Sequence, residues 1–123
     1  MYLVLLFAPL APLFCPPALA SDYEIGTSLV CDTQAQVERF VAVFSGDTQA
    51  AIRFVNAEER NTSACVIGNV AYMRGIQFGM VRHGDSAFEI VRILLIGIET
   101  ENGIPPVRPS VYFSLFSVKE YAV

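Results

Sequence analysis

The sequence has one histidine, no closely spaced pair of cysteines and no cluster of basic residues. A single imidazole excludes sites built from two or three histidines, and cysteines without the C-x-x-C spacing do not form a zinc knuckle. A net charge of -4 argues against a nucleic-acid partner, because DNA and RNA are held by basic surfaces. We therefore expect no metal, no cofactor and no nucleic acid.

The sequence also lacks paired carboxylates and a glycine-rich phosphate loop. A glycosidase needs two acidic side chains facing across a cleft, and the acidic residues here are scattered at the ends of expected elements. Glycines in the second half are separated by strand-like residues, which does not produce a phosphate cradle. These absences argue against a glycosidase and against an enzyme that binds phosphate groups through a glycine-rich loop.

His83 is the one side chain that suggests catalysis. As a general base it would need Asp85 to orient it, but the nearest hydroxyl, Ser86, belongs to the same expected turn. A catalytic triad needs three groups that converge from a supporting scaffold. The pattern favours an exposed turn histidine and no catalytic residues, and an enzyme using His83 remains an alternative.

Residues 1–20 carry no charged side chain and contain four prolines, and Ala18-Leu19-Ala20 precedes Ser21. This pattern predicts a secretory signal peptide (1–20) cleaved after Ala20, followed by a single domain (21–123). No basic residue precedes the apolar run, so the assigned start at Met1 is in question. A retained membrane anchor is the rival interpretation, but a spanning helix needs about 20 apolar residues without such a density of prolines.

Removal of the leader takes away Cys15 and leaves Cys31 and Cys65. An even number of cysteines in a periplasmic or secreted chain predicts a disulfide between them. Its closure would be worth about 3 to 4 kcal/mol in the chain-entropy model. The alternative is two buried free thiols.

Between the two cysteines the pattern is helical. Thr33 and Gln36 fit a capping box, and an apolar stripe follows at helical spacing until Ser45-Gly46 ends the helix. A second helix begins at Asp47 or Thr48 and ends in a polar cluster at residues 58–61. The short connection between them predicts a helical hairpin.

The rest of the chain reads as strands. The first strand ends at Cys31, before the helices, and later strands are expected at 64–73, 76–82, 88–98 and 110–117, with a proline-rich segment at 104–109 outside the sheet. Residues 88–98 are apolar on both faces, which is typical of a central strand or an inner barrel wall. The fold class is therefore α+β, with a helical hairpin inserted after the first strand and then an antiparallel sheet, for which a small SH3-like barrel is one available form.

Three aromatic residues near the C-terminus, Tyr112, Phe116 and Tyr121, suggest a partner surface on the face opposite Phe113. The alternative is a last strand covered on both sides by the helical hairpin and the N-terminal strand. The second interpretation is favoured, because aromatic residues of small domains mostly lie in the core.

Four runs carry a resemblance: residues 26–33 (GTSLVCDT), 36–40 (QVERF), 55–58 (VNAE) and Ala64-Cys65. With these runs the chain resembles small exported proteins of unknown function from alphaproteobacteria, rhizobia in particular. The likeness covers residues 26 to about 75. It implies a bacterial, exported domain with paired cysteines, and it implies no activity and no catalytic or binding residues.

Taken together, the sequence predicts a non-catalytic periplasmic or secreted domain that binds a protein or envelope partner. The alternative is a small-molecule or lipid-binding module that uses apolar space between the helical hairpin and the sheet.

Overall fold

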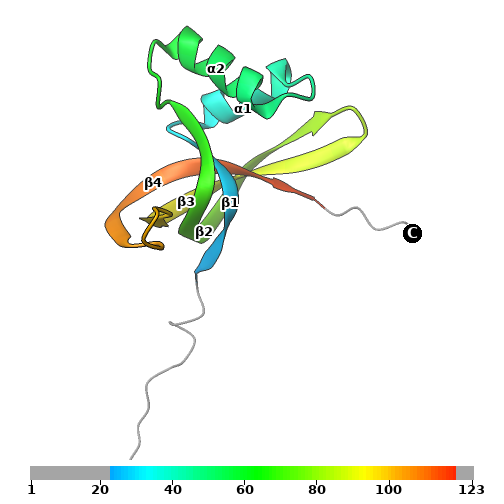
Figure 1. The fold of residues 1–123 in the computed structure, drawn as a ribbon. Helices are drawn as coiled ribbons and strands as arrows, with labels where there is room; N and C mark the ends of the chain where they lie inside the picture. The colour runs from blue at the N-terminus through cyan, green and yellow to red at the C-terminus, as the bar shows by residue number, and fades with distance from the viewer. Residues whose placement is uncertain (1–22, 119–123) are drawn as a thin grey trace, which may run out of the picture.

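In the computed structural model, which describes residues 23–118, two helices lie over one side of a four-stranded antiparallel sheet (Figure 1). The predicted α+β class is confirmed, and the predicted signal peptide lies outside the described residues. None of the helices in this part of the chain has the length and apolarity to span a membrane. The elements, in chain order, are β1 Glu24–Cys31, α1 Gln34–Val43, α2 Thr48–Glu59, β2 Cys65–His83, β3 Ser86–Ile98 and β4 Pro106–Ser117.

Both helices begin where the sequence predicted, because local side chains satisfy the first main-chain amides. The Gln36 amide donates to Thr33 Oγ1 over 3.2 Å, and the Thr33 amide donates to Gln36 Oε1 over 3.1 Å, which is a complete capping box. Asp47 caps α2 by accepting from the Ala50 amide over 3.0 Å.

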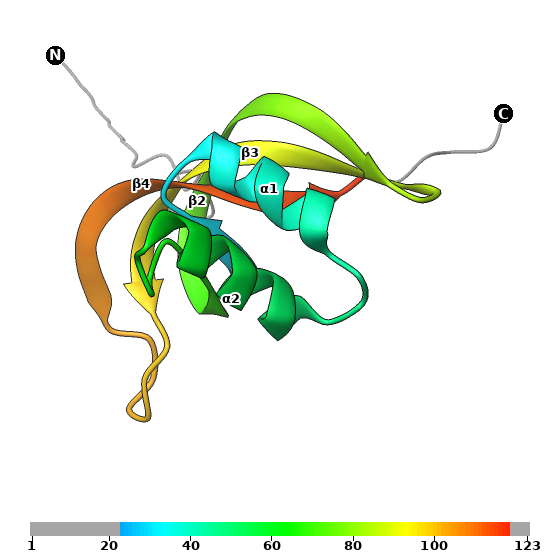
Figure 2. The same cartoon turned by 90° about the horizontal axis from the view of Figure 1, so that it is seen from above.

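The two helices pack side by side above the sheet (Figure 2). Polar contacts join them: Gln36 Nε2 donates to Glu59 Oε1 over 2.6 Å, and Arg39 pairs with Glu58 at 2.9 Å. Their apolar stripes are buried toward the sheet, in a core that includes Val37, Phe40, Ile52 and Val55. The predicted helical hairpin is confirmed.

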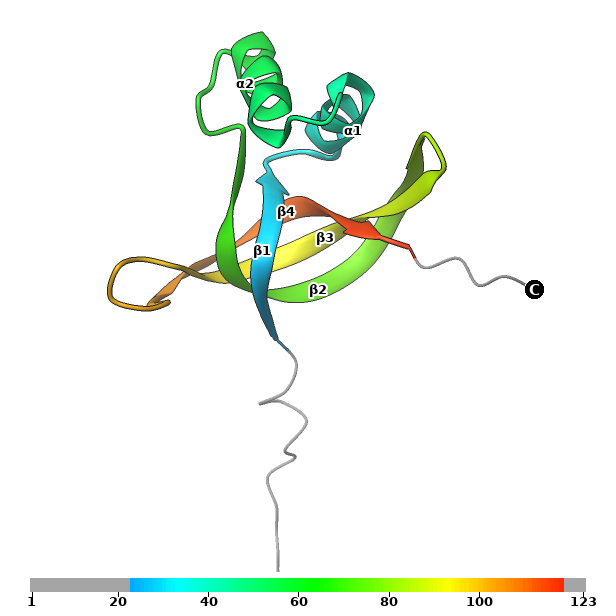
Figure 3. The same ribbon diagram turned by 45° about the vertical axis from the view of Figure 1, so that its right-hand side comes forward.

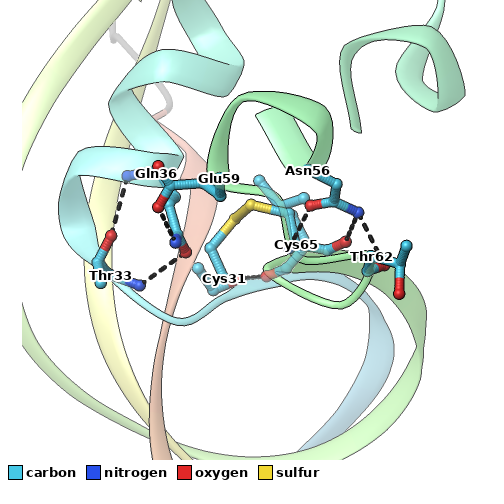
Figure 4. Close-up of a disulfide and its surroundings, with 9 residues drawn as sticks. Cys31, Thr33, Gln36, Asn56, Glu59, Thr62 and Cys65 are labelled. Atoms are coloured by element: carbon cyan, nitrogen blue, oxygen red, sulfur yellow. Dashed lines mark hydrogen bonds between the residues drawn. A yellow bond between two sulfur atoms is a disulfide. The ribbon is translucent and has the colours of Figure 1, made fainter. Parts of the chain in front are cut away.

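A disulfide closes the base of this hairpin, as predicted (Figure 4). Cys31 ends β1 and Cys65 begins β2, and the two residues lie directly opposite each other in the antiparallel register. Both are completely buried. The Asp32 amide adds a main-chain hydrogen bond to the Ala64 oxygen over 3.0 Å. The disulfide therefore ties the two ends of the helical insert together at the sheet.

The side chain of Asn56 forms a second clamp beside the disulfide (Figure 4). Its Oδ1 accepts from the Cys65 amide over 2.8 Å, and its Nδ2 donates to the main-chain oxygens of Cys65 and Thr62 over 3.0 Å each. One amide group thereby joins α2 to the start of β2 and to the loop between them.

The predicted strands 64–73 and 76–82 are wrong as separate elements, because β2 runs without interruption from Cys65 to His83. Register shifts against β3 occur at Arg74/Gln77 and Gln77/Gly79, so the bend predicted at Arg74-Gly75 is a bulge inside one strand. A Cβ atom on Gly75 would lie 2.8 Å from the Arg92 main-chain oxygen, so glycine permits the close approach.

The expected start of the last strand is also wrong. β4 begins at Pro106 rather than residue 110, and Pro106 pairs with Gly97. Proline is tolerated on a strand edge because it lacks only a donor that the edge does not use. Within the described chain, β4 pairs with β1 at Phe113 alone, so the other side of its first half is such an edge.

The sheet curls until β4 meets β1 (Figure 3). Among the described residues, the register between these two strands consists of the single pair Cys31 and Phe113, so the sheet does not form a regular barrel. The Ser114 hydroxyl donates to the Leu29 main-chain oxygen over 2.5 Å beside this pair. A side-chain hydrogen bond thereby adds to the single main-chain pair that joins β1 and β4.

Two apolar cores lie on the two faces of the sheet. The helices cover the first core, and the second lies inside the curl and includes Val30, Tyr72, Val91 and Ile93. The central position predicted for residues 88–98 is confirmed, because β3 pairs with both β2 and β4. We expected both faces of this strand to be buried along its whole length. Both faces are buried only near Ile90, which is itself fully buried, whereas Ile98 is 45% exposed.

Candidate functional site

An apolar groove lies between the helices and the sheet, with a volume of about 270 Å³. From the helices it is lined by Phe40, Val41, Phe44 and Thr48. From the sheet it is lined by Thr27, Ser28, Leu29, Ile67, His83, Phe88 and Leu115. Thr27 and His83 are exposed at its rim, so the groove opens to solvent. Ligand pockets in proteins share this composition of mostly apolar walls with a few polar groups.

His83 joins the hairpin between β2 and β3 to the end of α1. It is the last residue of β2, opposite Ser86, and its Nε2 lies 2.7 Å from the Phe44 main-chain oxygen. The imidazole also packs edge-on against the Phe44 ring, with 5.3 Å between ring centroids. Since a carbonyl oxygen only accepts, Nε2 carries the proton of this bond, and in the neutral ring Nδ1 is left as an acceptor. His83 therefore holds one wall of the groove.

Among the described residues, His83 is not part of a group of converging side chains of the kind a catalytic triad needs. In residues 23–118, no hydrogen bond joins His83 to Asp85, and the Phe44 carbonyl occupies Nε2 instead. The predicted exposure of His83 is confirmed. The same part of the chain contains no group of three or more His, Cys, Asp and Glu side chains that would hold a metal ion.

One edge of β1 faces the groove through its main chain. The Leu29 oxygen accepts from Ser114 of β4, so the main-chain groups of Leu29 turn away from β2. Main-chain groups alternate sides along a strand, so those of Thr27 turn the same way. β1 and β4 diverge from the Cys31–Phe113 pair, and the groove lies beside this divergence.

Tyr112 and Phe116 do not line the groove. Both are partly buried against the core inside the curl, whereas Phe113 packs against the helix-side core, so their predicted position opposite Phe113 is confirmed. The Phe116 ring contacts Tyr72, at 5.8 Å between centroids, and lies 3.8 Å below the Arg74 guanidinium. Tyr121, the third member of the predicted partner surface, lies outside the described residues. A surface shared by all three stays a prediction.

Arg74 organises a charged network at the open end of this second core. Its Nε and Nη2 donate to the two carboxylate oxygens of Glu24 over 3.0 and 2.9 Å, and Nη1 lies 3.7 Å from Glu89. The hydrogen bonds from Arg74 lower the pKa of Glu24 below its ordinary value. The network therefore links β1, β2 and β3, and the contact of Arg74 with the Phe116 ring adds β4.

Some of the residues that line the groove could be predicted from the sequence, and others could not. The apolar space expected between the helical hairpin and the sheet is present, and Phe40, Val41 and Phe44 follow from the helical stripe. Phe88 and Leu115 come from distant strands, and no local pattern links them to α1. The alternation of apolar and polar residues in these two strands indicates only which side chains share a face of the sheet.

Comparison with protein-family models, with curated proteins and with solved structures found no match for this chain.

Proposed function

We propose that this protein is an exported, non-catalytic domain that holds an apolar group of a protein or envelope partner in the groove. The observation that carries the proposal is the apolar groove of about 270 Å³ that opens at Thr27 and His83. Its walls are tied together by the disulfide, by Asn56 and by the His83 bond to Phe44, and a fixed site binds without first having to be ordered.

The proposed compartment is the periplasm or the medium, after removal of residues 1–20 as a signal peptide. The buried Cys31–Cys65 disulfide supports an oxidising environment. Intact mass of the exported protein with and without reductant tests this. A mass for residues 21–123 that rises by two hydrogens on reduction is expected, and a full-length mass with free thiols would overturn the assignment.

The proposed kinship is with the small exported proteins of alphaproteobacteria that the runs around Cys31 and Cys65 resemble. We also propose that the sheet is a small SH3-like barrel in which β1 and β4 are only weakly paired. The strand order and the single Cys31–Phe113 pair between β1 and β4 support this description.

The groove is tested by NMR titration of the chain from Ser21 with 1-hexanol, a neutral apolar probe. We expect chemical-shift changes confined to groove residues, and their loss in Ile67→Asp. Ile67 is 38% exposed and lines the groove, so an added carboxylate lowers its affinity for apolar groups with little effect on the core.

The matched control is Val66→Asp. Val66 is the neighbour of Ile67 in β2, is 43% exposed and does not line the groove. Because successive side chains of a strand point to opposite faces, this variant carries the same charge away from the groove. Equal hexanol binding by both variants, or shifts spread over the whole sheet, would contradict the proposal.

The second candidate function is a small-molecule or lipid-binding module that uses the same groove. The volume favours it, because a cavity of about 150 Å³ is large enough to bind benzene. Native mass spectrometry of protein purified without detergent distinguishes the two functions. A retained small ligand appears as added mass, whereas a domain that binds a macromolecular partner shows the mass of its chain alone.

A further inference from the structure

We propose that the groove takes an extended polypeptide segment, which adds as a strand to the free edge of β1 and places one apolar side chain between the helices and the sheet. This inference rests on the proposed function and deepens it, because it identifies the partner as a polypeptide chain. In strand addition, main-chain hydrogen bonds give affinity and a pocket for alternate side chains gives specificity.

The first support is an open seam between two strands, formed by residues 25–29 of β1 and 115–117 of β4. Within the described chain, residues 25–29 have register partners only in β2, and residues 115–117 have them only in β3. The two strands separate as they leave the Cys31–Phe113 pair (Figure 3). Each side of the seam is therefore a stretch of strand without a neighbour.

The second support is the direction of the main-chain groups along the seam. The hydrogen bond from Ser114 turns those of Leu29 toward β4, and by alternation those of Thr27 turn the same way. On the other side, the Val118 amide donates to β3 over 3.0 Å, so alternation turns the groups of Leu115 toward β1. A lipid tail leaves such groups unpaired, whereas an extended chain can pair with them.

The third support is a difference between the seam and the other free edge of the sheet. The first half of β4 has no register pair with β1 in the described chain, and Pro109 there lacks the N–H that the same alternation would turn outward. Proline and lysine on an edge strand prevent pairing with other chains. Residues 25–29 and 115–117 contain neither. The seam is therefore the edge that stays available for pairing.

The seam opens into the groove on the helix side. Thr27, Leu29 and Leu115 line the groove from the seam, and Phe40 and Phe44 line it from α1. Because side chains of a strand alternate between its two faces, every second side chain of an added strand points to the helix side. The volume of about 270 Å³ has room for one aromatic ring, since a cavity of about 150 Å³ binds benzene.

The charge of the site defines the segment further. Among the described residues, none that forms the seam or lines the groove is Lys, Arg, Asp or Glu. A charged side chain of the partner would lose its hydration there without gaining an ion pair. The segment that complements this site is therefore uncharged and extended, with an aromatic or large aliphatic residue at its centre.

The test is NMR titration of the chain from Ser21 with the neutral peptide acetyl-Ser-Thr-Val-Phe-Val-Thr-Ser-amide. We expect shift changes at the main-chain amides of Thr27 and Leu115 together with the groove residues. Two matched control peptides keep every side chain and carry N-methyl groups on alternate residues, along one edge or the other. At least one of them should bind about tenfold more weakly, because methylation removes the main-chain donors of that edge.

A pair of protein variants tests the same bonds from the other side. Thr27→Pro removes the donor that faces the seam, and proline fits this position because that N–H does not bond to β2. Thr27→Val loses the same hydroxyl and keeps the N–H, so the comparison isolates the main-chain donor. Thr27→Pro should bind the peptide about tenfold more weakly than Thr27→Val. Circular dichroism verifies folding, and if Thr27→Pro does not fold, the methylated peptides decide the question.

The outcomes separate this inference from the proposed function. Equal binding of the peptide and both methylated forms, or no peptide binding while 1-hexanol still shifts the groove residues, would overturn strand addition and leave the groove as a site for apolar groups. Absence of shifts with both hexanol and the peptide would overturn the proposed function as well. A dimer detected by sedimentation and abolished by Thr27→Pro would assign the seam to a second copy of the chain, which also contradicts the proposal.

Discussion

Ser114 of β4 donates a hydrogen bond through its hydroxyl to the main-chain oxygen of Leu29 in β1, and the Ser114 residue is fully buried. The bond lies beside Cys31–Phe113, the one register pair that joins these strands in the described chain. A serine at this position supplies a donor where the two strands begin to diverge. The curl of the sheet is therefore held by a side chain as well as by a ladder.

Ser114→Ala is expected to lower the free energy of unfolding by about 1 to 3 kcal/mol, because it leaves the Leu29 carbonyl buried without this donor. Urea denaturation followed by circular dichroism measures the change. Ser117→Ala, at the exposed end of the same strand, is the matched control and should change stability by less than about 0.5 kcal/mol. Equal effects of the two substitutions would show that the bond adds nothing.

Replacing both Cys31 and Cys65 by alanine is expected to destabilise the domain by about 3 to 4 kcal/mol, mainly by freeing the loop in the unfolded chain. The two cysteines are 34 residues apart in the sequence, and both are completely buried. The measurement is urea denaturation with and without dithiothreitol. Reductant should weaken the unaltered protein and leave the double variant unchanged, and a reductant-sensitive double variant would refute this account.

Asn56→Ala is expected to cost about 2 to 3 kcal/mol, because it removes three hydrogen bonds that join α2 to Cys65 and Thr62. Asn56→Asp should be similarly destabilising, since it keeps the acceptor for the Cys65 amide but replaces two donors by a charge facing two carbonyl oxygens. Gln49→Ala, on an exposed position of the same helix, controls for helix propensity. Hydrogen exchange should locate the loss at residues 61–66 first.

The Glu24–Arg74 pair predicts a pH dependence. Arg74 lowers the pKa of Glu24 from the ordinary 4.5, so the folded state binds the proton less well than the unfolded state. The pair therefore contributes stability that is fully present above pH 4.5 and is lost as the pH falls through the lowered folded value. Because the Glu24 side chain is 45% exposed, we expect a contribution of no more than about 1 kcal/mol.

Glu24→Gln tests this linkage. The unaltered protein should be the more stable of the two at pH 7, and the difference should shrink as the pH falls below 4.5 and through the lowered pKa of folded Glu24, as measured by urea denaturation at a series of acidic pH values. Glu101→Gln is the control, since Glu101 lies in the turn between β3 and β4 and forms no ion pair within the described residues. A difference that is independent of pH would assign the effect to packing rather than to charge.

Local chemistry made much of the insert predictable. The capping box at Thr33 and the Asp47 cap depend on residues three positions apart, so the sequence alone contains both partners. The pairing of Cys31 with Cys65 was predicted by counting the cysteines that remain once the expected leader, with Cys15, is removed. The disulfide in turn implied that the helices form a closed loop on the sheet.

The strand boundaries were less predictable. Gly75 reads as a turn signal, yet its missing side chain serves a bulge in a continuous β2, because the Arg92 oxygen approaches from β3. Pro106 and Pro109 read as strand breakers, yet they fit an edge of β4 that β1 does not pair with. Both outcomes depend on neighbouring strands rather than on the residue itself.

By itself, the amino-acid sequence determined the helix starts, the buried stripes and the disulfide, because each of these follows from side chains that are close together in the chain or from the number of cysteines. Only the tertiary structure decided that Ser114 reaches Leu29, that His83 bonds to Phe44 and that Phe88 and Leu115 face α1 across a groove. The two hydrogen bonds join residues that are 85 and 39 positions apart in the sequence. All of these contacts depend on how far the sheet curls. The curl is set by bulges and packing summed over four strands, which no short sequence pattern encodes.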